Sequence, residues 1–106
     1  MMSLYTRLMK SLRDDPKVEI LAEARGARAV KAIQTVFFGD DEAKAKEWAE
    51  QFSPATLRGA RLVVFSMLKR KHRDVHFRIV LGRDSVLGER RSWATGQALL
   101  RKVLDV

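Results

Sequence analysis

The chain has 106 residues, the length of one ordinary domain, so a second domain with a cleft between the two is not expected. It contains no cysteine, which excludes disulfides, thiolate zinc sites and cysteine nucleophiles. Lysine and arginine outnumber aspartate and glutamate by 21 to 13, and the resulting net charge of +8 indicates an anionic partner.

The first predicted element is a short helix. Its apolar residues recur at helical spacing: Leu4, Leu8, Met9 and Leu12. Proline biases the residue before it away from helical backbone, so this helix should end at Asp14-Asp15-Pro16.

Residues 18–38 carry conflicting signals for secondary structure. Their alanines favour a helix, whereas the branched and aromatic residues towards position 38 favour a strand. Gly26 favours a reversal of the chain, because a glycine inside a helix costs about 1 kcal/mol. We therefore expect a hairpin with strands at roughly 18–24 and 29–38, and a helix is the alternative.

Residues 39–53 have the clearest helical pattern. Asp40 and Asp41 follow Gly39, and aspartate is a strong N-cap. An apolar stripe then recurs at helical spacing: Ala45, Trp48, Ala49 and Phe52. Ser53-Pro54 should end this helix.

The C-terminal half predicts a second hairpin and a final helix. Residues 62–68 are branched and aromatic, residues 75–81 alternate between apolar and polar, and residues 69–74 would form the tip between them. Residues 82–91 are expected to be a loop, and Ser92 to cap the last helix. The predicted fold is a single small α+β domain over 1–106, in which helices alternate with antiparallel hairpins in the order α-ββ-α-ββ-α.

Two short segments resemble each other. They are Arg25-Gly26-Ala27-Arg28-Ala29-Val30 and Arg58-Gly59-Ala60-Arg61-Leu62-Val63. If a duplication produced them, each copy should lead into a strand. Six residues are also short enough for the match to arise by chance.

The charge is distributed unevenly. Residues 1–53 carry as many acidic as basic side chains, so residues 54–106 account for the whole excess. Arginine predominates among the basic residues there, and its planar guanidinium suits phosphates and stacked bases better than an ammonium group does. Nucleic acid, either DNA or RNA, is therefore the expected partner of this basic C-terminal half.

The sharpest basic feature is the run from Lys69 to Arg73 at the predicted hairpin tip. Such a ribbon can lie in a groove of a duplex and release counterions from phosphates, although a charged tip can also simply prevent strand edges from pairing. Arg90 and Arg91 precede a helix start, where free backbone N–H groups attract anions. The predicted nucleic-acid-binding residues are Lys69, Arg70, Lys71, Arg73, Arg78, Arg90 and Arg91.

Two other groups of residues could be functional sites but are better explained by structure. His72, Asp74, His76 and Arg78 would share one face of a strand, as in a metal site or a base held by a carboxylate. The spacing of His72 and His76 is also that of a zinc-protease helix, but Arg73 stands where the catalytic glutamate would be and no third ligand is near. We interpret them as polar residues of an exposed edge and expect no metal. Trp48 and Trp93 could stack on bases, but both fall on apolar stripes and are expected in the core.

Three hypotheses about function follow. The main one is a small nucleic-acid-binding protein without enzymatic activity or cofactor. The alternative is a protein-interaction module, such as an inhibitor or adaptor, whose basic face docks on an acidic protein or on another protein's nucleic-acid channel. The third is a magnesium-dependent nuclease that would use the carboxylates Glu19, Glu23, Asp40 and Asp41, although helix capping explains the last two better.

The sequence also bears on location. The longest uncharged stretch, residues 92–100, is far shorter than the roughly 20 apolar residues that span a bilayer. No apolar run near the start resembles a secretory signal. A soluble protein of the cytoplasm, without a membrane partner, is therefore expected.

Overall fold

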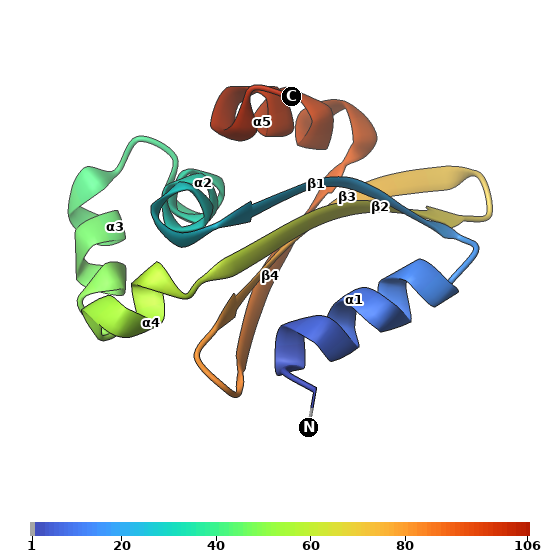
Figure 1. The fold of residues 1–106 in the computed structure, drawn as a ribbon. Helices are drawn as coiled ribbons and strands as arrows, with labels where there is room; N and C mark the ends of the chain where they lie inside the picture. The colour runs from blue at the N-terminus through green and yellow to red at the C-terminus, as the bar shows by residue number, and fades with distance from the viewer. Residues whose placement is uncertain (1) are drawn as a thin grey trace.

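A computed structural model describes residues 2–106 and confirms the α+β class (Figure 1). Within these residues, five helices accompany one four-stranded antiparallel sheet. In chain order the elements are α1 (Leu4–Asp14), β1 (Val18–Arg25), α2 (Gly26–Phe38), α3 (Glu42–Ala49), α4 (Pro54–Arg58), β2 (Arg61–Lys69), β3 (His72–Leu81), β4 (Ser85–Ser92) and α5 (Trp93–Leu104).

The strands lie in the order β1-β2-β3-β4, and each is antiparallel to its neighbours. Strands β2, β3 and β4 form a meander with short turns, whereas residues 26–60, which include three helices, connect β1 to β2. Figure 1 shows α2 and α5 on one face of the sheet and α1 on the other. We call these the covered face and the half-open face.

The covered face contains the larger hydrophobic core. Alternation along β2 and β3 directs one set of their apolar side chains towards α2 and α5, since successive residues of a strand point to opposite faces. Phe77 and Ile79 of β3 pack there in one cluster with Ile33 of α2 and Leu100 of α5.

Helix α5 approaches the sheet closely at Gly96. A Cβ atom built on this glycine would lie 2.3 Å from Cβ of Val75 on β3, far inside van der Waals contact. The absence of a side chain at position 96 therefore sets the distance between α5 and β3.

The half-open face has a smaller core under α1. Tyr5, Met9 and Leu12 of α1 are buried, and they pack against a patch formed by Val63, Phe65 and Val80. These contacts confirm the predicted first helix and its apolar side. Elsewhere on this face the side chains of β3 and β4 are mostly polar or charged.

The predicted strand at 29–38 is wrong, because these residues belong to α2. Ala29, Val30, Ile33 and Val36 are buried at helical spacing against the sheet. Tertiary burial thus overrides the strand propensity of the branched side chains. Gly26 does reverse the chain, with φ +61°, but it opens a helix.

Three other boundaries differ from the predictions. The expected loop at 82–91 contains strand β4, and the hairpin tip is only residues 70–71. Ser53-Pro54 begins α4, where the Ser53 hydroxyl accepts a hydrogen bond from the backbone N–H of Thr56. At the final helix, which starts beside Ser92 as expected, that serine makes no side-chain capping bond.

Candidate nucleic-acid interface

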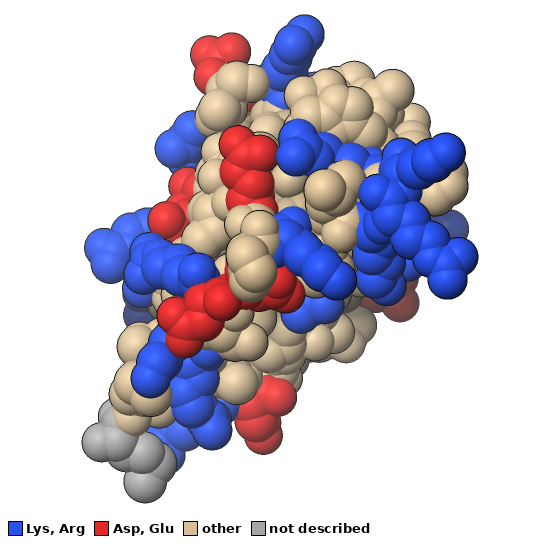
Figure 2. Space-filling model, turned by 90° about the vertical axis from the view of Figure 1, so that its right-hand side faces the viewer, with Lys and Arg blue, Asp and Glu red and all other residues tan. Residues whose placement is uncertain are grey.

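The tip of the β2–β3 hairpin projects its cations into solvent. Lys69 pairs with His72 across the two strands, which leaves Arg70 and Lys71 as the turn. Every residue from Lys69 to Arg73 is exposed. Figure 2 views this end of the molecule, and lysine and arginine side chains dominate the right-hand side of that surface.

Arg70 has an unusual backbone conformation. Its φ of +54° lies in the left-handed region, which glycine adopts freely and which costs other residues about 1–2 kcal/mol. Strained residues of this kind concentrate at functional sites. The positive φ follows from the two-residue turn, whose first residue adopts it in β-hairpins, and arginine occupies a position where glycine would be more stable.

Beside the tip, a strip of β3 and β4 remains uncovered on the half-open face. His72, Asp74, His76 and Arg78 alternate along β3 and share this face, as predicted. Arg90 lies opposite His76 on β4. We call the side chains of Asp74, His76, Arg78 and Arg90, together with Gly88, the open strip.

A shallow hollow of about 480 Å³ lies in the open strip over Gly88 and is lined by Arg78 and Arg90. Gly88 pairs with Arg78, and a Cβ atom on it would lie 2.9 Å from the carbonyl oxygen of Phe77 and 3.1 Å from Cγ of Arg78. The missing side chain thus lets the stem of Arg78 lie flat against β4.

Phe65, on the neighbouring strand β2, packs beside the middle of the open strip. This fully buried ring stacks on His76, with centroids 4.9 Å apart and planes 4° apart. The guanidinium of Arg78 lies 5.4 Å from the same ring, which adds a cation–π contact. One buried aromatic residue therefore orders two polar side chains that face solvent.

The charge of the open strip is positive. Arg90 Nε lies 3.8 Å from Asp74 Oδ2, a pairing that leaves most of the Arg90 side chain exposed, and Asp74 is the strip's one carboxylate. Burial, followed by the positive charge of Arg78, lowers the pKa of His76 below its usual value of 6.5. His76 is therefore neutral at neutral pH, when it can donate or accept a hydrogen bond.

Two of the predicted binding residues lie on the covered face instead. Arg73 contacts Glu19 at 3.7 Å, and its guanidinium lies 5.0 Å from the ring of Trp93. Arg91 donates hydrogen bonds to the backbone oxygen of Val36 on α2 and to the carboxylate of Glu89.

Arg91 therefore ties α2 to β4, and its charge is partly neutralised. Arg90 and Arg91 are consecutive in a strand and point to opposite faces, so the structure does not bring them together as a clamp. Lys69, Arg70, Lys71, Arg78 and Arg90 are the predicted residues that lie at the tip or on the open strip.

Both tryptophans pack against apolar neighbours. Trp48 contacts Phe37, Phe38 and Phe52 in an edge-to-face cluster, with ring centroids 5.2 to 6.3 Å apart. Trp93 packs partly buried against the main core. Neither ring is presented as a free platform for a base.

The carboxylates considered for magnesium are dispersed. Glu19 pairs with Arg73, Glu23 accepts a hydrogen bond from the Tyr5 hydroxyl, and Asp41 caps α3. Asp40 lies 3.8 Å from Lys102. Over the residues that the structure describes, no three histidine, aspartate or glutamate side chains gather as a metal site would require.

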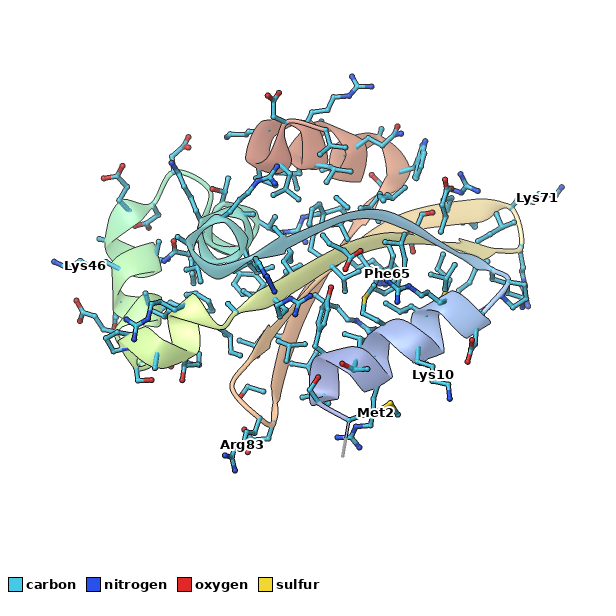
Figure 3. The ribbon with its side chains drawn as sticks, in the orientation of Figure 1. Met2, Lys10, Lys46, Phe65, Lys71 and Arg83 are labelled. Atoms are coloured by element: carbon cyan, nitrogen blue, oxygen red, sulfur yellow. The ribbon has the colours of Figure 1, made fainter. Side chains whose placement is uncertain are left out.

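A second group of cations was not predicted from the sequence. Arg7, Arg25, Arg58, Arg61 and Arg83 line a cavity at the far end of the sheet from the hairpin tip. Figure 3 labels Lys71 at the tip and Arg83 at the β3–β4 turn, the two ends of this meander. The only signal in the sequence was the pair of similar segments that begin at Arg25 and Arg58.

No family model, curated protein or solved structure matches the chain. None of the helices in residues 2–106 has the length and apolar character needed to cross a bilayer.

Proposed function

We propose that the protein binds nucleic acid through the hairpin tip and the open strip, contacting phosphates without performing a reaction. The observation that carries this proposal is the uncovered part of the half-open face. An antiparallel sheet usually buries one face or both, and here basic side chains occupy the part that no helix covers. Cations on an exposed ribbon suit the regular anionic backbone of a nucleic acid.

The spacing of the cations supports the same proposal. Residues two apart on a strand lie about 6.7 Å from each other on one face. Arg90, opposite His76, and Arg78, two residues further along β3, are therefore neighbours on the half-open face, and the tip cations lie beyond Asp74 at the end of the same strand. The phosphates of one nucleic-acid strand can therefore contact several of these cations at once.

The choice of arginine at position 70 also fits the proposal. A tip that served only to terminate the hairpin would be more stable with glycine or asparagine at this φ. An exposed arginine in that position is consistent with a side chain that contacts a binding partner and not the rest of the protein.

A protein partner is the second candidate, and the edge strand favours it. Strand β4 has only β3 beside it, and it exposes Val86 and Leu87. An acidic protein could pair with this edge while its carboxylates face Arg90 and Arg78. Binding would then depend on a few anchors, whereas phosphate contacts add up one by one.

The salt dependence of binding tests the proposal. Fluorescently labelled duplex and single-stranded DNA and RNA should be titrated with protein across a series of salt concentrations. With one phosphate contact for each of the five cations at the tip and on the open strip, the slope of log affinity against log salt should be about −3.5 to −4.5, taking about 0.7 to 0.9 per contact. A flat slope, or no binding to any of the four probes, would overturn the proposal.

Two matched triple variants locate the interface. Replacement of Lys69, Arg70 and Lys71 by alanine should weaken binding and flatten the slope by about two to three units. The control replaces the exposed Lys31, Lys44 and Lys46 on α2 and α3 and loses the same charge. Figure 3 places Lys46 on the opposite side of the molecule from Lys71. Equal losses in both variants would show that only net charge matters.

A further inference from the structure

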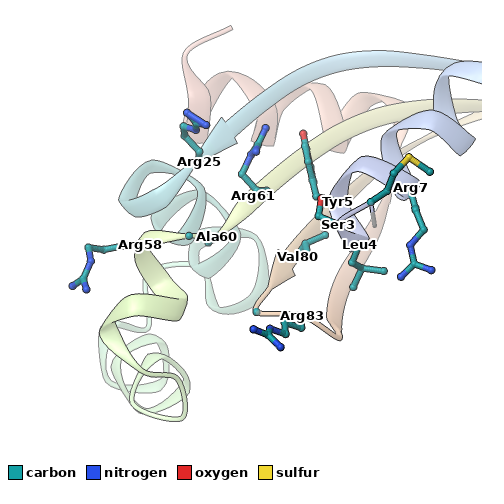
Figure 4. Close-up of a pocket in the computed structure, with 13 residues that line it drawn as sticks. Ser3, Leu4, Tyr5, Arg7, Arg25, Arg58, Ala60, Arg61, Val80 and Arg83 are labelled. Carbon is teal, nitrogen blue, oxygen red and sulfur yellow. The ribbon is translucent and has the colours of Figure 1, made fainter.

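At the end of the sheet opposite the hairpin tip lies a cavity of about 710 Å³ (Figure 4). Its wall comes from the start of α1, the end of β1, the end of α4 with the residues that follow it, the start of β2, the end of β3 and the β3–β4 turn. All of these except β3 contribute one arginine, namely Arg7, Arg25, Arg58, Arg61 and Arg83 in chain order. Strand β2 separates this cavity from the tip by about 26 Å, at roughly 3.3 Å per residue.

The two similar segments of the sequence meet at this cavity. Arg25 pairs with Arg61 across β1 and β2, and the backbone N–H of Gly26 donates a 2.8 Å hydrogen bond to the carbonyl oxygen of Ala60. One copy opens a helix and the other enters a strand, so they do not share a structure. Their arginines nevertheless come together, and Figure 4 shows Arg25 and Arg61 side by side, with Arg7 across the cavity.

Glycine at position 26 makes this contact possible. Its φ is +61°, and a Cβ atom there would lie 3.3 Å from the carbonyl oxygen of Arg58. The chain can therefore turn from β1 into α2 directly against the end of α4. This turn fixes the backbone of Arg25 and Arg58 on the same rim.

The five guanidinium groups are not neutralised by the protein. Throughout residues 2–106, no carboxylate lies within ion-pair distance of any of them. The nearby Glu23 accepts a 2.7 Å hydrogen bond from the Tyr5 hydroxyl. Burial, assisted by Glu23, raises the pKa of Tyr5 to about 12, so this hydroxyl remains a donor to the carboxylate. Guanidinium groups without a carboxylate partner remain available to an anion, and their hydrogen bonds to phosphate oxygens are short and strong.

The cavity also has apolar walls. The ring of Tyr5 is buried, and the guanidinium of Arg61 lies 4.1 Å from its centroid. Leu4, Ala60 and Val80 add aliphatic surface. The volume falls in the range of about 300–1,000 Å³ that small-molecule sites occupy. A ligand that combines several negative charges with a flat organic group would match both kinds of wall.

We propose that this cavity binds the di- or triphosphate group of a nucleotide, with the nucleoside against the apolar wall. One phosphate monoester carries a charge of about −1.5 to −2, whereas five unpaired arginines match two or three phosphate groups better. Guanidinium forks bind phosphate oxygens in pairs, which suits arginine rather than lysine at such a site. The same chemistry is found in a free nucleotide and in the triphosphorylated 5′ end of an RNA strand.

Calorimetric titration of the purified full chain with ATP tests the site. ATP should bind in a saturable manner, inorganic tripolyphosphate should compete with it, and adenosine alone should bind far more weakly. Replacing the exposed Arg25, Arg58 and Arg83 by glutamine should weaken ATP binding at least about tenfold, since a hydrogen bond to a charged group contributes about 1.5–3 kcal/mol. The single variant Arg83→Gln, in a surface turn, provides a milder change should the triple variant fail to fold.

The matched control removes the same charge elsewhere. Alanine at Lys69, Arg70 and Lys71 should leave ATP affinity within about twofold, because exposed charges separated by more than a Debye length of about 8 Å are largely screened. Absence of saturable ATP binding, or equal weakening by the tip variant, would overturn the proposal. This site does not depend on the proposed interface, since the tip variant is defective for nucleic acid and the cavity variant for ATP.

A second comparison distinguishes the two sources of phosphate. One RNA oligonucleotide should be prepared with a 5′-triphosphate and with a 5′-hydroxyl. Tighter binding of the triphosphorylated form, lost in the cavity variant, would assign the site to strand ends. Saturable ATP binding with equal affinity for the two oligonucleotides would assign it to free nucleotides. If neither ligand depends on the cavity arginines, the assignment is wrong.

Discussion

The two faces of the sheet are built from the same strands but are used differently. Two helices close the covered face, where even Arg91 is fixed by hydrogen bonds to α2 and to Glu89. One helix closes about half of the other face, where Arg90 remains exposed. Alternation within a strand thus separates neighbouring arginines into a structural and a solvent-facing residue. The face on which an arginine of β4 lies therefore decides whether it stabilises the fold or remains available to a partner.

The largest expected effect comes from filling the contact at Gly96. The Gly96→Ala variant places a methyl group where Val75 already stands, so α5 must move away from β3. Unfolding by denaturant should show a loss of about 2–3 kcal/mol, the upper part of the usual range for overpacking. The double variant Gly96→Ala with Val75→Ala should recover part of this loss. Wild-type stability of the single variant would contradict the close approach.

Arg90 and Arg91 provide the most direct test of the comparison between faces. Arg91→Ala should destabilise the fold by about 1–2 kcal/mol, because the carbonyl of Val36 loses its hydrogen bond to a charged donor. Arg90→Ala should change stability by less than about 0.5 kcal/mol, as exposed substitutions usually do.

The same pair should behave in the opposite way in binding. Arg90→Ala is expected to weaken nucleic-acid binding and to reduce the salt slope by about one unit, and Arg91→Ala to leave the slope unchanged. Thermal unfolding and anisotropy titrations of both variants measure the two properties. If both arginines affect binding equally, the division between faces does not describe the interface.

At the tip, a substitution should raise stability slightly and weaken binding. Arg70→Gly should raise stability by about 0.5–1 kcal/mol, because glycine adopts the observed φ without steric cost. The same change should weaken binding to nucleic acid. The neighbouring Lys71→Gly variant, at a position without positive φ, should weaken binding with no gain in stability.

The smallest effect concerns pH and His76. Burial and Arg78 lower the pKa of His76 in the folded state, so the unfolded chain binds more protons just below pH 6.5. The associated stability is complete above the unfolded pKa of about 6.5 and is lost as pH falls towards the lowered folded value. The thermal midpoint should therefore decrease from pH 7 to pH 5, and His76→Gln should reduce that decrease. The exposed His72→Gln serves as the control, and equal effects of the two variants would exclude burial as the cause.

The sequence predicted the elements whose burial pattern is simple. The stripe of α1 and the alternation from Val75 to Leu81 each have one apolar side that matches one core. Strand β4 was missed because it is an edge strand with no buried residue, so its pattern lacks apolar alternation. Helix α2 was missed because its valine and isoleucine also suit a strand, and only contact with the sheet decides between the two.

The candidate sites also differ in how far the sequence predicts them. The tip cations are consecutive in the chain, so a run of five basic or titratable residues predicted their common location. The face of the sheet to which Arg91 points depends on the pairing of β4 with β3. Because residues 82–91 were expected to be a loop, no such pairing was predicted. The cavity arginines come from five separate segments, and only the folded topology brings them together.

The long connection between β1 and β2 has a consequence for the order of folding. Residues 26–60 separate these neighbouring strands, whereas β2, β3 and β4 are joined by short turns and followed directly by α5. Closing a longer loop costs more entropy, and contacts between distant residues slow folding. We expect the β2–β4 meander with α5 to form the folding nucleus and β1 to pair last. In stopped-flow experiments, Phe77→Leu should mainly slow refolding, while Ile20→Val should mainly accelerate unfolding.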